Sequence, residues 1–484
     1  MRWPHVFHTV GVLVLFFGLT LLAPVIFSLV MADSRSLVPL LQAMGIALIS
    51  GGALMLVFRH GKVDIVTQRE GMAIVAMGWA AIGLFGAFPF YLSDSAFSFT
   101  NAVFESVSGF TTTGATILSD IEALGPGLVF WRGFIQWLGG MGIIVLSIAI
   151  LPFLGIDGIH MYKAEIPTPM PDKLKPHLRD TALILLKVYL SLTLIEMVLL
   201  MLCGMGPVDA LNQALTTMST GGNSSRNASI AHFNSPAIDG VIVLFMLLGG
   251  INFALHYQFI KGKPLAFWRD AECRVFLGIC LVLSLLVGLN LYQTVYPDIL
   301  NSLRYAAFQV VSIITSTGYV TADYEKWPAL SQMILFLCMF VGASAGSTSG
   351  GMKCLRLMVC FKYCYKELFS IIHPRSVTHI KIGGKTVPEA VVRNVLGFLA
   401  LYILLFAVNA LMMAGIGHVD MPTAIAAVAS AMGNIGPGFG TVGPTENYAA
   451  ISTAGKWLLS WCMLLGRLEI YTLIILVMPE FWRK

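Results

Sequence analysis

The chain has 484 residues, of which 57% are hydrophobic and only 11% are charged, and its formal net charge is +5. Soluble globular domains carry about 25% charged residues, so this composition excludes a soluble globule and indicates an integral membrane protein. The apolar runs follow one another without a long polar stretch, which excludes a large aqueous domain. The small net charge, divided among loops, predicts no nucleic-acid partner.

Ten apolar runs are long enough to cross about 30 Å of hydrocarbon. They cover residues 10–31, 38–58, 71–92, 127–154, 181–204, 237–260, 275–296, 329–361, 392–416 and 454–479. If the N-terminus is inside, the basic loops all face the cytoplasm, as the positive-inside rule requires. These loops are 59–69, 163–179, 261–274 and 353–393. Ten crossings then place both termini in the cytoplasm.

Four of the outward connections contain an additional apolar segment that is too short to span, which is typical of a re-entrant helix. These segments are residues 97–110, 208–218, 299–314 and 421–432. A stretch of small residues with glycine follows each one, namely GFTTTGAT, MSTGGNSS, ITSTGYVT and GNIGPGFG. The order of span, short helix, loop and span therefore occurs four times.

The four loops align on Thr113-Gly114, Thr220-Gly221, Thr317-Gly318 and Ile435-Gly436. A glycine in each following span gives a second landmark, at Gly139-Gly140, Gly249-Gly250, Gly342 and Gly466. We therefore predict an all-α integral membrane fold, with four pseudo-symmetric repeats around one pore and two extra N-terminal helices. The predicted boundaries are 1–70 for the extra helices, and 71–178, 179–274, 275–391 and 392–484 for the repeats.

Non-helical backbone at membrane depth is tolerated only where it is buried in protein or lines an aqueous cavity. Glycine lets backbone carbonyl oxygens turn inward, where they can replace the hydration shell of a cation. The loops near 111–115, 218–222, 315–319 and 433–437 are thus predicted to form a selectivity filter. Its expected ligands are Thr112, Thr113, Gly114, Thr220, Gly221, Thr317, Gly318, Asn434, Ile435 and Gly436.

These loops match the potassium-channel filter TVGYG only in part. The third loop, TSTGYV, is closest, and the fourth replaces threonine with Ile435. Unequal loops predict fewer ordered ion sites and weaker discrimination between potassium and sodium. Each loop alone is also typical of a Gly/Ser turn on a membrane surface, so the prediction depends on all four together.

The predicted span 329–361 is interrupted at residues 342–351, which are all Gly, Ala, Ser or Thr. Each interior glycine costs a helix about 0.8–1.0 kcal/mol relative to alanine, so we expect a break here and a loop that plugs the pore under the filter. The expected gate residues in this loop are Gly342, Ser344, Gly346, Ser347, Gly350 and Gly351. Two alternatives are close helix packing through small residues and a serine nucleophile at Ser344 in GASAG. The nucleophile motif lacks a preceding strand and a histidine and acid partner.

Arg467 lies inside the last predicted span, where an arginine must face the bundle interior or water. We expect its guanidinium to project below the filter, to pair with gate-loop carbonyls and to form a barrier to cation exit. A structural pair with Glu196 or Glu469 is the alternative. Three other polar residues are expected to make scaffolding hydrogen bonds behind the filter: Glu105, Arg132 and Gln136.

The whole pattern resembles the Trk/Ktr/HKT superfamily of potassium transporters, and within it the bacterial TrkH and TrkG type, which has two helices before the first repeat. The resemblance implies a homodimer in the bacterial inner membrane, with potassium in the filter of each protomer. It also implies a gate loop in the third repeat and a cytoplasmic nucleotide-binding ring of the TrkA type. In that superfamily, a glycine at the position of Gly114 is associated with a preference for potassium, and a serine there is associated with a preference for sodium. The basic stretch 362–393 is the expected contact for the partner or for anionic lipid.

Gated potassium uptake is therefore the predicted function, with no cofactor bound by the chain itself, because it has no Walker A run and no strand-linked GxGxxG. An ion-coupled secondary symporter, driven by protons or sodium, is the first alternative. Such carriers usually show two inverted repeats, whereas the four repeats here share one orientation. An intramembrane serine hydrolase at Ser344 is the remote alternative.

Overall fold

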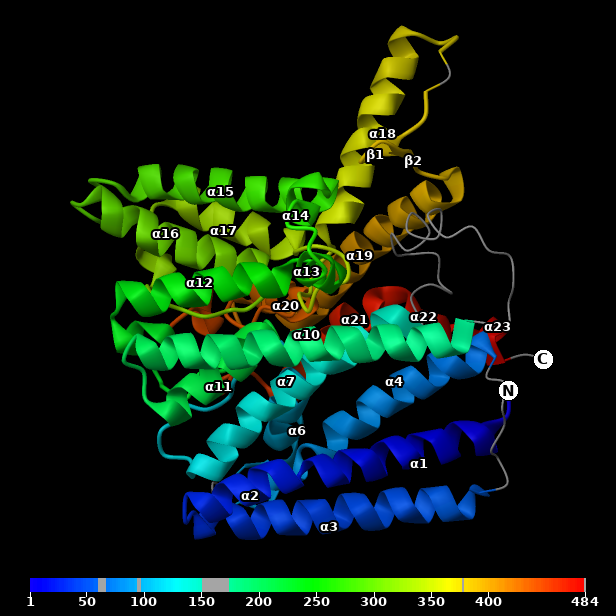
Figure 1. Cartoon of the computed structure of the whole chain (residues 1–484), viewed down its shortest axis with the longest axis vertical. Helices are drawn as coiled ribbons and strands as arrows, with labels where there is room; N and C mark the ends of the chain where they lie inside the picture. The colour runs from blue at the N-terminus through cyan, green and yellow to red at the C-terminus, as the bar shows by residue number, and fades with distance from the viewer. Residues whose placement is uncertain (60–66, 94–96, 150–173, 377, 483–484) are drawn as a thin grey trace.

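The computed structural model describes residues 1–59, 67–93, 97–149, 174–376 and 378–482. Helices packed side by side make up nearly all of this part, as Figure 1 shows. Within it, seven helices are long and apolar enough to cross a membrane, or eight if one bent pair counts as a span. The all-α membrane fold predicted from the sequence is therefore confirmed.

The two extra N-terminal helices form a hairpin along the first repeat. α1 (Trp3–Thr20) continues into α2 (Leu22–Val30), and α3 (Ser34–Val57) returns along α1. Asp33, in the turn between them, accepts a hydrogen bond of 2.9 Å from the backbone N–H of Gly127. At the other end of the hairpin, Arg2 forms a two-point ion pair with Glu70. The hairpin is thus fastened to the first repeat at both ends.

The remaining helices form four units of span, short helix, loop and span. The first unit has α4 (Gln68–Phe85), α5 (Phe88–Tyr91), α6 (Phe99–Phe110) and α7 (Pro126–Ala149). The second has α10 (Leu174–Leu202), α11 (Pro207–Met218), α12 (Pro236–Gly250), α13 (Phe253–Ile260) and α14 (Ala266–Arg269). The third has α15 (Ala271–Leu291), α16 (Ile299–Ile314), α17 (Ala329–Val341) and α18 (Cys354–Ile372). The fourth has α19 (Glu389–Ile416), α20 (Met421–Gly433), α21 (Thr453–Arg467), α22 (Glu469–Val477) and α23 (Pro479–Trp482).

Five of the predicted spans are divided between two helices. Two of these breaks are short, at Leu21 and at Gly86-Ala87, and the other three are as follows. The predicted span 237–260 is wrong as a straight crossing, because α12 and α13 meet at a bend of 102° where Asn252 caps α13. The last predicted span breaks at Leu468, and Glu469 has a φ of +54°. The break expected within 342–351 is present between α17 and α18. Residues 150–154 of the predicted span 127–154 lie outside the described residues.

The four short helices α6, α11, α16 and α20 begin on the side that the sequence places outside. Ser98 and Asp298 cap α6 and α16 by accepting backbone hydrogen bonds of 3.2 Å. Their C-terminal turns are buried, so their partially negative ends point into the protein. This geometry brings the four loops that follow them to one place.

The helix α18 extends well beyond the helix bundle, and a small hairpin of β1 (Lys381–Ile382) and β2 (Lys385–Thr386) follows it (Figure 1). This hairpin was not among the elements expected from the sequence, and its turn is Gly383-Gly384 with φ angles of +57° and +80°. The two chain ends lie together at one end of the molecule, where Trp3 stacks on Trp482 with a ring separation of 5.4 Å (Figure 1).

Candidate functional site

The four loops share one backbone conformation. In each loop a residue with left-handed φ is followed by a residue of ordinary φ and then by a left-handed glycine. The first residues of these triplets are Thr112, Thr220, Ser316 and Asn434, and the glycines are Gly114, Gly222, Gly318 and Gly436. The middle residues donate backbone N–H bonds of 2.8–3.0 Å to the preceding short helix, from Thr113, Gly221, Thr317 and Ile435. The repeated geometry shows that the four loops are structural equivalents.

This geometry corrects the sequence alignment of the second loop by one residue. Gly222, with φ of +74°, is the counterpart of Gly114, whereas Gly221 is the counterpart of Thr113. Alignment on the dipeptide Thr-Gly is wrong for this loop, because Thr220 has the left-handed φ of the first residue of the triplet and is the counterpart of Thr112. The sequence STGG contains a second glycine, and that residue was the available clue.

The four loops form a closed ring in chain order. Each left-handed glycine lies against a backbone carbonyl oxygen of the next loop, and the last glycine lies against the first loop. A Cβ atom added to Gly114 would lie 2.2 Å from the carbonyl oxygen of Gly221, and one added to Gly222 would lie 1.9 Å from that of Thr317. A Cβ atom added to Gly318 would lie 1.8 Å from the carbonyl oxygen of Ile435, and one added to Gly436 would lie 2.7 Å from that of Thr113. Since no side chain fits at these distances, the ring requires glycine at all four positions.

The carbonyl oxygens of the middle residues are unequal in their surroundings. In the part of the chain that the structure describes, no donor reaches the carbonyl oxygen of Thr113, Thr317 or Ile435, although all three residues are buried. The carbonyl oxygen of Gly221 instead accepts a hydrogen bond of 2.7 Å from Gln136 Nε2. Buried carbonyl groups normally have a partner, and a desolvated cation is a partner that such oxygens can take.

A buried polar cluster holds the first two loops from behind. Arg132 Nε donates to Glu105 at 2.8 Å, and both side chains are almost fully buried. Glu105 also accepts hydrogen bonds from Thr116 and from the backbone of Ile117, just after the first loop. With the contact from Gln136 to the second loop, all three residues predicted as scaffold make the expected hydrogen bonds.

Two of the landmark glycines mark places where a span crosses the end of a short helix. A Cβ atom at Gly139 would lie 2.0 Å from the carbonyl oxygen of Phe110, the last residue of α6. A Cβ atom at Gly466 would lie 2.2 Å from the carbonyl oxygen of Met432, in the last turn of α20. The glycines therefore allow the spans to approach the ring closely.

The break between α17 and α18 is a loop that lies against the inner ends of the short helices. The hydroxyl of Thr348 donates to the carbonyl oxygen of Met218, the last residue of α11, at 3.1 Å. The backbone N–H of Gly350 donates to Ser316 Oγ at 2.7 Å, and a Cβ atom at Gly350 would lie 2.3 Å from the carbonyl oxygen of Gly433. The loop thus contacts the second, third and fourth repeats directly beneath the ring.

Arg467 reaches this loop. Its Nη1 donates to the carbonyl oxygen of Thr348 at 2.6 Å, and its Nη2 donates to Gly139 at 3.2 Å. The side chain is 2% exposed. Among the described residues it forms no ion pair with Glu196 or Glu469, since Glu469 pairs with Arg356 on α18. The contact expected between Arg467 and gate-loop carbonyls is therefore present, and the alternative pairs are not.

Two further charged residues hold the loop, and neither was expected from the sequence. Glu272, at the start of α15, accepts backbone hydrogen bonds from Ala345 at 2.7 Å and from Leu355 at 3.1 Å. Lys353, whose φ is +70°, donates from Nζ to the carbonyl oxygen of Ser349. Glu272 had no local signal, because its two contacts join segments that are 73 and 83 residues apart in the chain. Lys353 lies only four residues after Ser349, but no sequence motif marked this contact.

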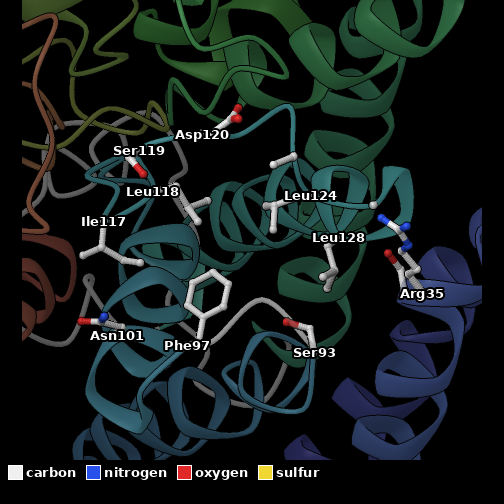
Figure 2. Close-up of a pocket in the computed structure, with 13 residues that line it drawn as sticks. Arg35, Ser93, Phe97, Asn101, Ile117, Leu118, Ser119, Asp120, Leu124 and Leu128 are labelled. Atoms are coloured by element: carbon white, nitrogen blue, oxygen red, sulfur yellow. The ribbon is translucent and has the colours of Figure 1, made fainter.

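A cavity of about 680 Å³ lies beside the first loop rather than in the ring. Figure 2 shows Arg35 of the N-terminal hairpin on one side of it and Phe97, Asn101 and Asp120 of the first repeat on the other. Asn101 also accepts a hydrogen bond of 2.9 Å from Lys456 of the fourth repeat. None of the residues of the ring or of the gate loop lines this cavity.

Comparison with known proteins gives matches over the whole chain. The family "TrkH: Cation transport protein" matches residues 39–484. The Trk system potassium uptake protein TrkH of Salmonella typhimurium is 38% identical over 100% of both chains. The Trk system potassium uptake protein TrkG of Escherichia coli strain K12 is 35% identical over 99% of this chain and 98% of its own. The crystal structure of the potassium transporter TrkH from Vibrio parahaemolyticus covers 100% of both chains, with a TM-score of 0.92 and 37% identity.

Proposed function

The chain belongs to the TrkH family of cation transport proteins, and from this premise we propose that it takes up potassium through a gated pore. The observation that carries the proposal is the closed ring of four loops at the inner ends of four short helices. Three of its buried carbonyl oxygens have no donor among the described residues, and helix C-terminal ends favour a cation nearby. Because this family transports potassium and does not catalyse a reaction, a serine hydrolase at Ser344 is rejected.

Potassium is the cargo, and the ring is the proposed selectivity filter. Its ligands are the residues predicted from the sequence, with Gly222 and Ser316 added from the geometry. The ring is unequal, because its four middle residues are two threonines, one glycine and one isoleucine. This inequality supports moderate discrimination against sodium, as the sequence analysis expects. No further cofactor is proposed.

The loop between α17 and α18 is the proposed gate. It lies against three of the four repeats beneath the ring, and Arg467, Lys353 and Glu272 hold it there. A cation leaving the ring would meet this loop and the positive charge of Arg467. Opening therefore requires the loop to leave contacts that come from several helices.

Passive flow through a pore is preferred over ion-coupled carrier transport. All four short helices end at the same ring, so the repeats share one orientation. Carriers with a site at the membrane midplane are usually built from inverted repeats. The four parallel repeats support the pore. A proton-coupled or sodium-coupled symporter, which the sequence also allows, is the second candidate function.

The arm formed by α18 supports a second copy of the chain as a partner in the bacterial inner membrane. One face of α18 carries large apolar side chains that are 63–72% exposed: Phe361, Tyr365, Leu368 and Ile372. Their spacing places them along one side of the helix. We propose that this face contacts a second protomer.

The basic residues from 362 to 393 are the proposed contact for anionic lipid and for a TrkA-type nucleotide-binding ring. We place this contact on the cytoplasmic side, where the proposed topology also puts both termini.

Cation flux into liposomes that hold the purified protein tests the proposal. Uptake of potassium, rubidium, sodium and lithium is compared, with Gly114→Ser in parallel. We expect potassium and rubidium to enter faster than sodium and lithium, and the variant to lose part of this preference because a side chain at Gly114 displaces the second loop. Equal entry of sodium and potassium in the unaltered protein would contradict a potassium filter.

A further inference from the structure

The second loop differs from the others at the middle position of its triplet. Thr113, Thr317 and Ile435 carry side chains at this position, whereas the second loop has Gly221. The φ of Gly221 is not in the left-handed region, so its backbone conformation is open to other residues. The glycine must therefore be explained by the space around it.

Gln136 of α7 fills that space. A Cβ atom at Gly221 would lie 2.5 Å from both Cδ and Oε1 of Gln136 and 2.9 Å from its Nε2. Gln136 is fully buried. The amide of the first repeat thus occupies the volume that a side chain on the second loop would need.

The amide also fixes the second loop through two hydrogen bonds. Gln136 Nε2 donates to the carbonyl oxygen of Gly221 at 2.7 Å, and Gln136 Oε1 accepts from the backbone N–H of Asn223 at 3.0 Å. Asn223 in turn donates from Nδ2 to the carbonyl oxygen of Arg132, one turn before Gln136 on α7. The orientation of the amide is therefore set from both of its ends.

We propose that Gln136 is a specificity-determining residue of the filter, which holds the carbonyl oxygen of Gly221 at a fixed distance from the axis of the ring. The inference deepens the proposed function and rests on it. A carbonyl oxygen has two lone pairs, so Gly221 can bind the amide and a cation together, but it cannot move inward without losing the amide. A smaller ion needs closer oxygens, so this restraint disfavours sodium more than potassium.

The first test removes the amide without leaving a hole. Gln136→Met keeps a similar length and loses both hydrogen bonds. We expect the ratio of potassium to sodium uptake in proteoliposomes to fall by about three- to tenfold, because only the lost hydrogen bond to the carbonyl oxygen of Gly221 acts directly on the ring. Potassium uptake itself should continue. The matched control is Gln309→Met, which removes a buried amide that contacts Thr321 at 3.2 Å and no ring carbonyl, and which should leave the ratio unchanged.

The second test asks whether Gln136 and Gly221 share one volume. Gly221→Ala alone should reduce potassium uptake at least about tenfold, because the new Cβ overlaps the amide. Gln136→Ala combined with Gly221→Ala should recover a large part of the uptake. The comparison of uptake stays informative even if Gly221→Ala alone folds poorly, because the double variant removes the overlap between the new Cβ atom and the side chain at position 136.

The outcomes separate the inference from the proposed function. An unchanged or increased ratio of potassium to sodium uptake in Gln136→Met would overturn the inference, as would a double variant that is no better than Gly221→Ala. Equal uptake of sodium and potassium by the unaltered protein would instead contradict the proposed filter.

Discussion

Arg467 and Thr348 join the last repeat to the loop beneath the ring. Arg467 Nη1 donates to the Thr348 carbonyl oxygen at 2.6 Å, while the Thr348 hydroxyl donates to Met218 at the end of α11. One loop residue is thus held by the fourth repeat on one side and by the second repeat on the other. The loop is therefore anchored from two sides at this residue.

Replacement of Arg467 by alanine is expected to increase potassium flux. The change removes a positive charge from the exit path and a charge-assisted hydrogen bond, which is worth about 1.5–3 kcal/mol. We expect uptake into proteoliposomes to rise by about tenfold, as 1.4 kcal/mol corresponds to a factor of 10. Arg304→Ala, which breaks a 2.7 Å contact with Asp239 away from the loop, is the control. Unchanged flux in Arg467→Ala would argue against a barrier.

Glu272 is expected to hold the gate loop in its closed position, because one carboxylate oxygen accepts hydrogen bonds from Ala345 and Leu355, near the two ends of the loop. Glu272→Ala frees both N–H groups, so potassium uptake should rise several-fold. Glu272→Gln keeps an acceptor oxygen and should change uptake much less. Equal effects of the two substitutions on uptake would show that the acceptor is not what matters.

The sequence predicted the alternation of long and short helices and the helix break within 342–351 well, because both depend on local signals. Alternation of long and short apolar runs marks the spans and short helices, and a run of Gly, Ala, Ser and Thr cannot continue a buried helix at low cost. Residues 299–314 were expected as a short helix, and α16 has these bounds.

The details that the sequence could not predict depend on contacts between distant segments. Gly221 and Gly222 are indistinguishable as neighbouring glycines in the sequence. They differ in the folded protein, because Gln136 packs against Gly221 and the carbonyl oxygen of Thr317 lies against Gly222. The bend of 102° after Gly250 likewise has no proline, and its place is set by contacts such as the one from Phe253 N–H to the gate-loop carbonyl of Gly346. The role of Glu272 could not be predicted from the sequence either, because its hydrogen-bond partners are 73 and 83 residues away in the chain.

Asp33 is expected to stabilise the docking of the N-terminal hairpin. Burial of its carboxyl group opposes ionisation, but hydrogen bonds from Ser36 and from the backbone of Gly127 outweigh burial and lower the pKa of Asp33. Asp33→Ala removes a helix cap and should reduce the free energy of unfolding by about 0.5–2 kcal/mol. Thermal unfolding in detergent at pH 7 measures this loss.

The pH dependence of this loss follows from the direction of the pKa shift. Because the pKa is lowered in the folded protein, the contribution of Asp33 is complete above the ordinary carboxyl value near 4 and is lost as the pH falls through the lowered pKa. The difference in melting temperature between the unaltered protein and Asp33→Ala should therefore be constant from pH 7 to pH 5 and shrink below about pH 4. A difference that shrinks already between pH 7 and pH 5 would contradict this role. Asp298→Ala should cost less, because among the described residues the Asp298 side chain caps α16 and makes no hydrogen bond to another helix.

Gly222 is expected to be indispensable for the ring, although the dipeptide pattern pointed to its neighbour. Its φ of +74° costs a residue with a side chain about 1–2 kcal/mol, and a Cβ atom would lie 1.9 Å from the carbonyl oxygen of Thr317. Gly222→Ala must therefore push the second and third loops apart, and potassium uptake should fall by more than about tenfold. The control is Gly240→Ala on α12, where nothing lies within 4 Å of the new atom. Because alanine favours a helix by about 1 kcal/mol over glycine, the control protein should be at least as stable and transport normally. If Gly222→Ala also transported normally, the second loop could not have the conformation that closes the ring.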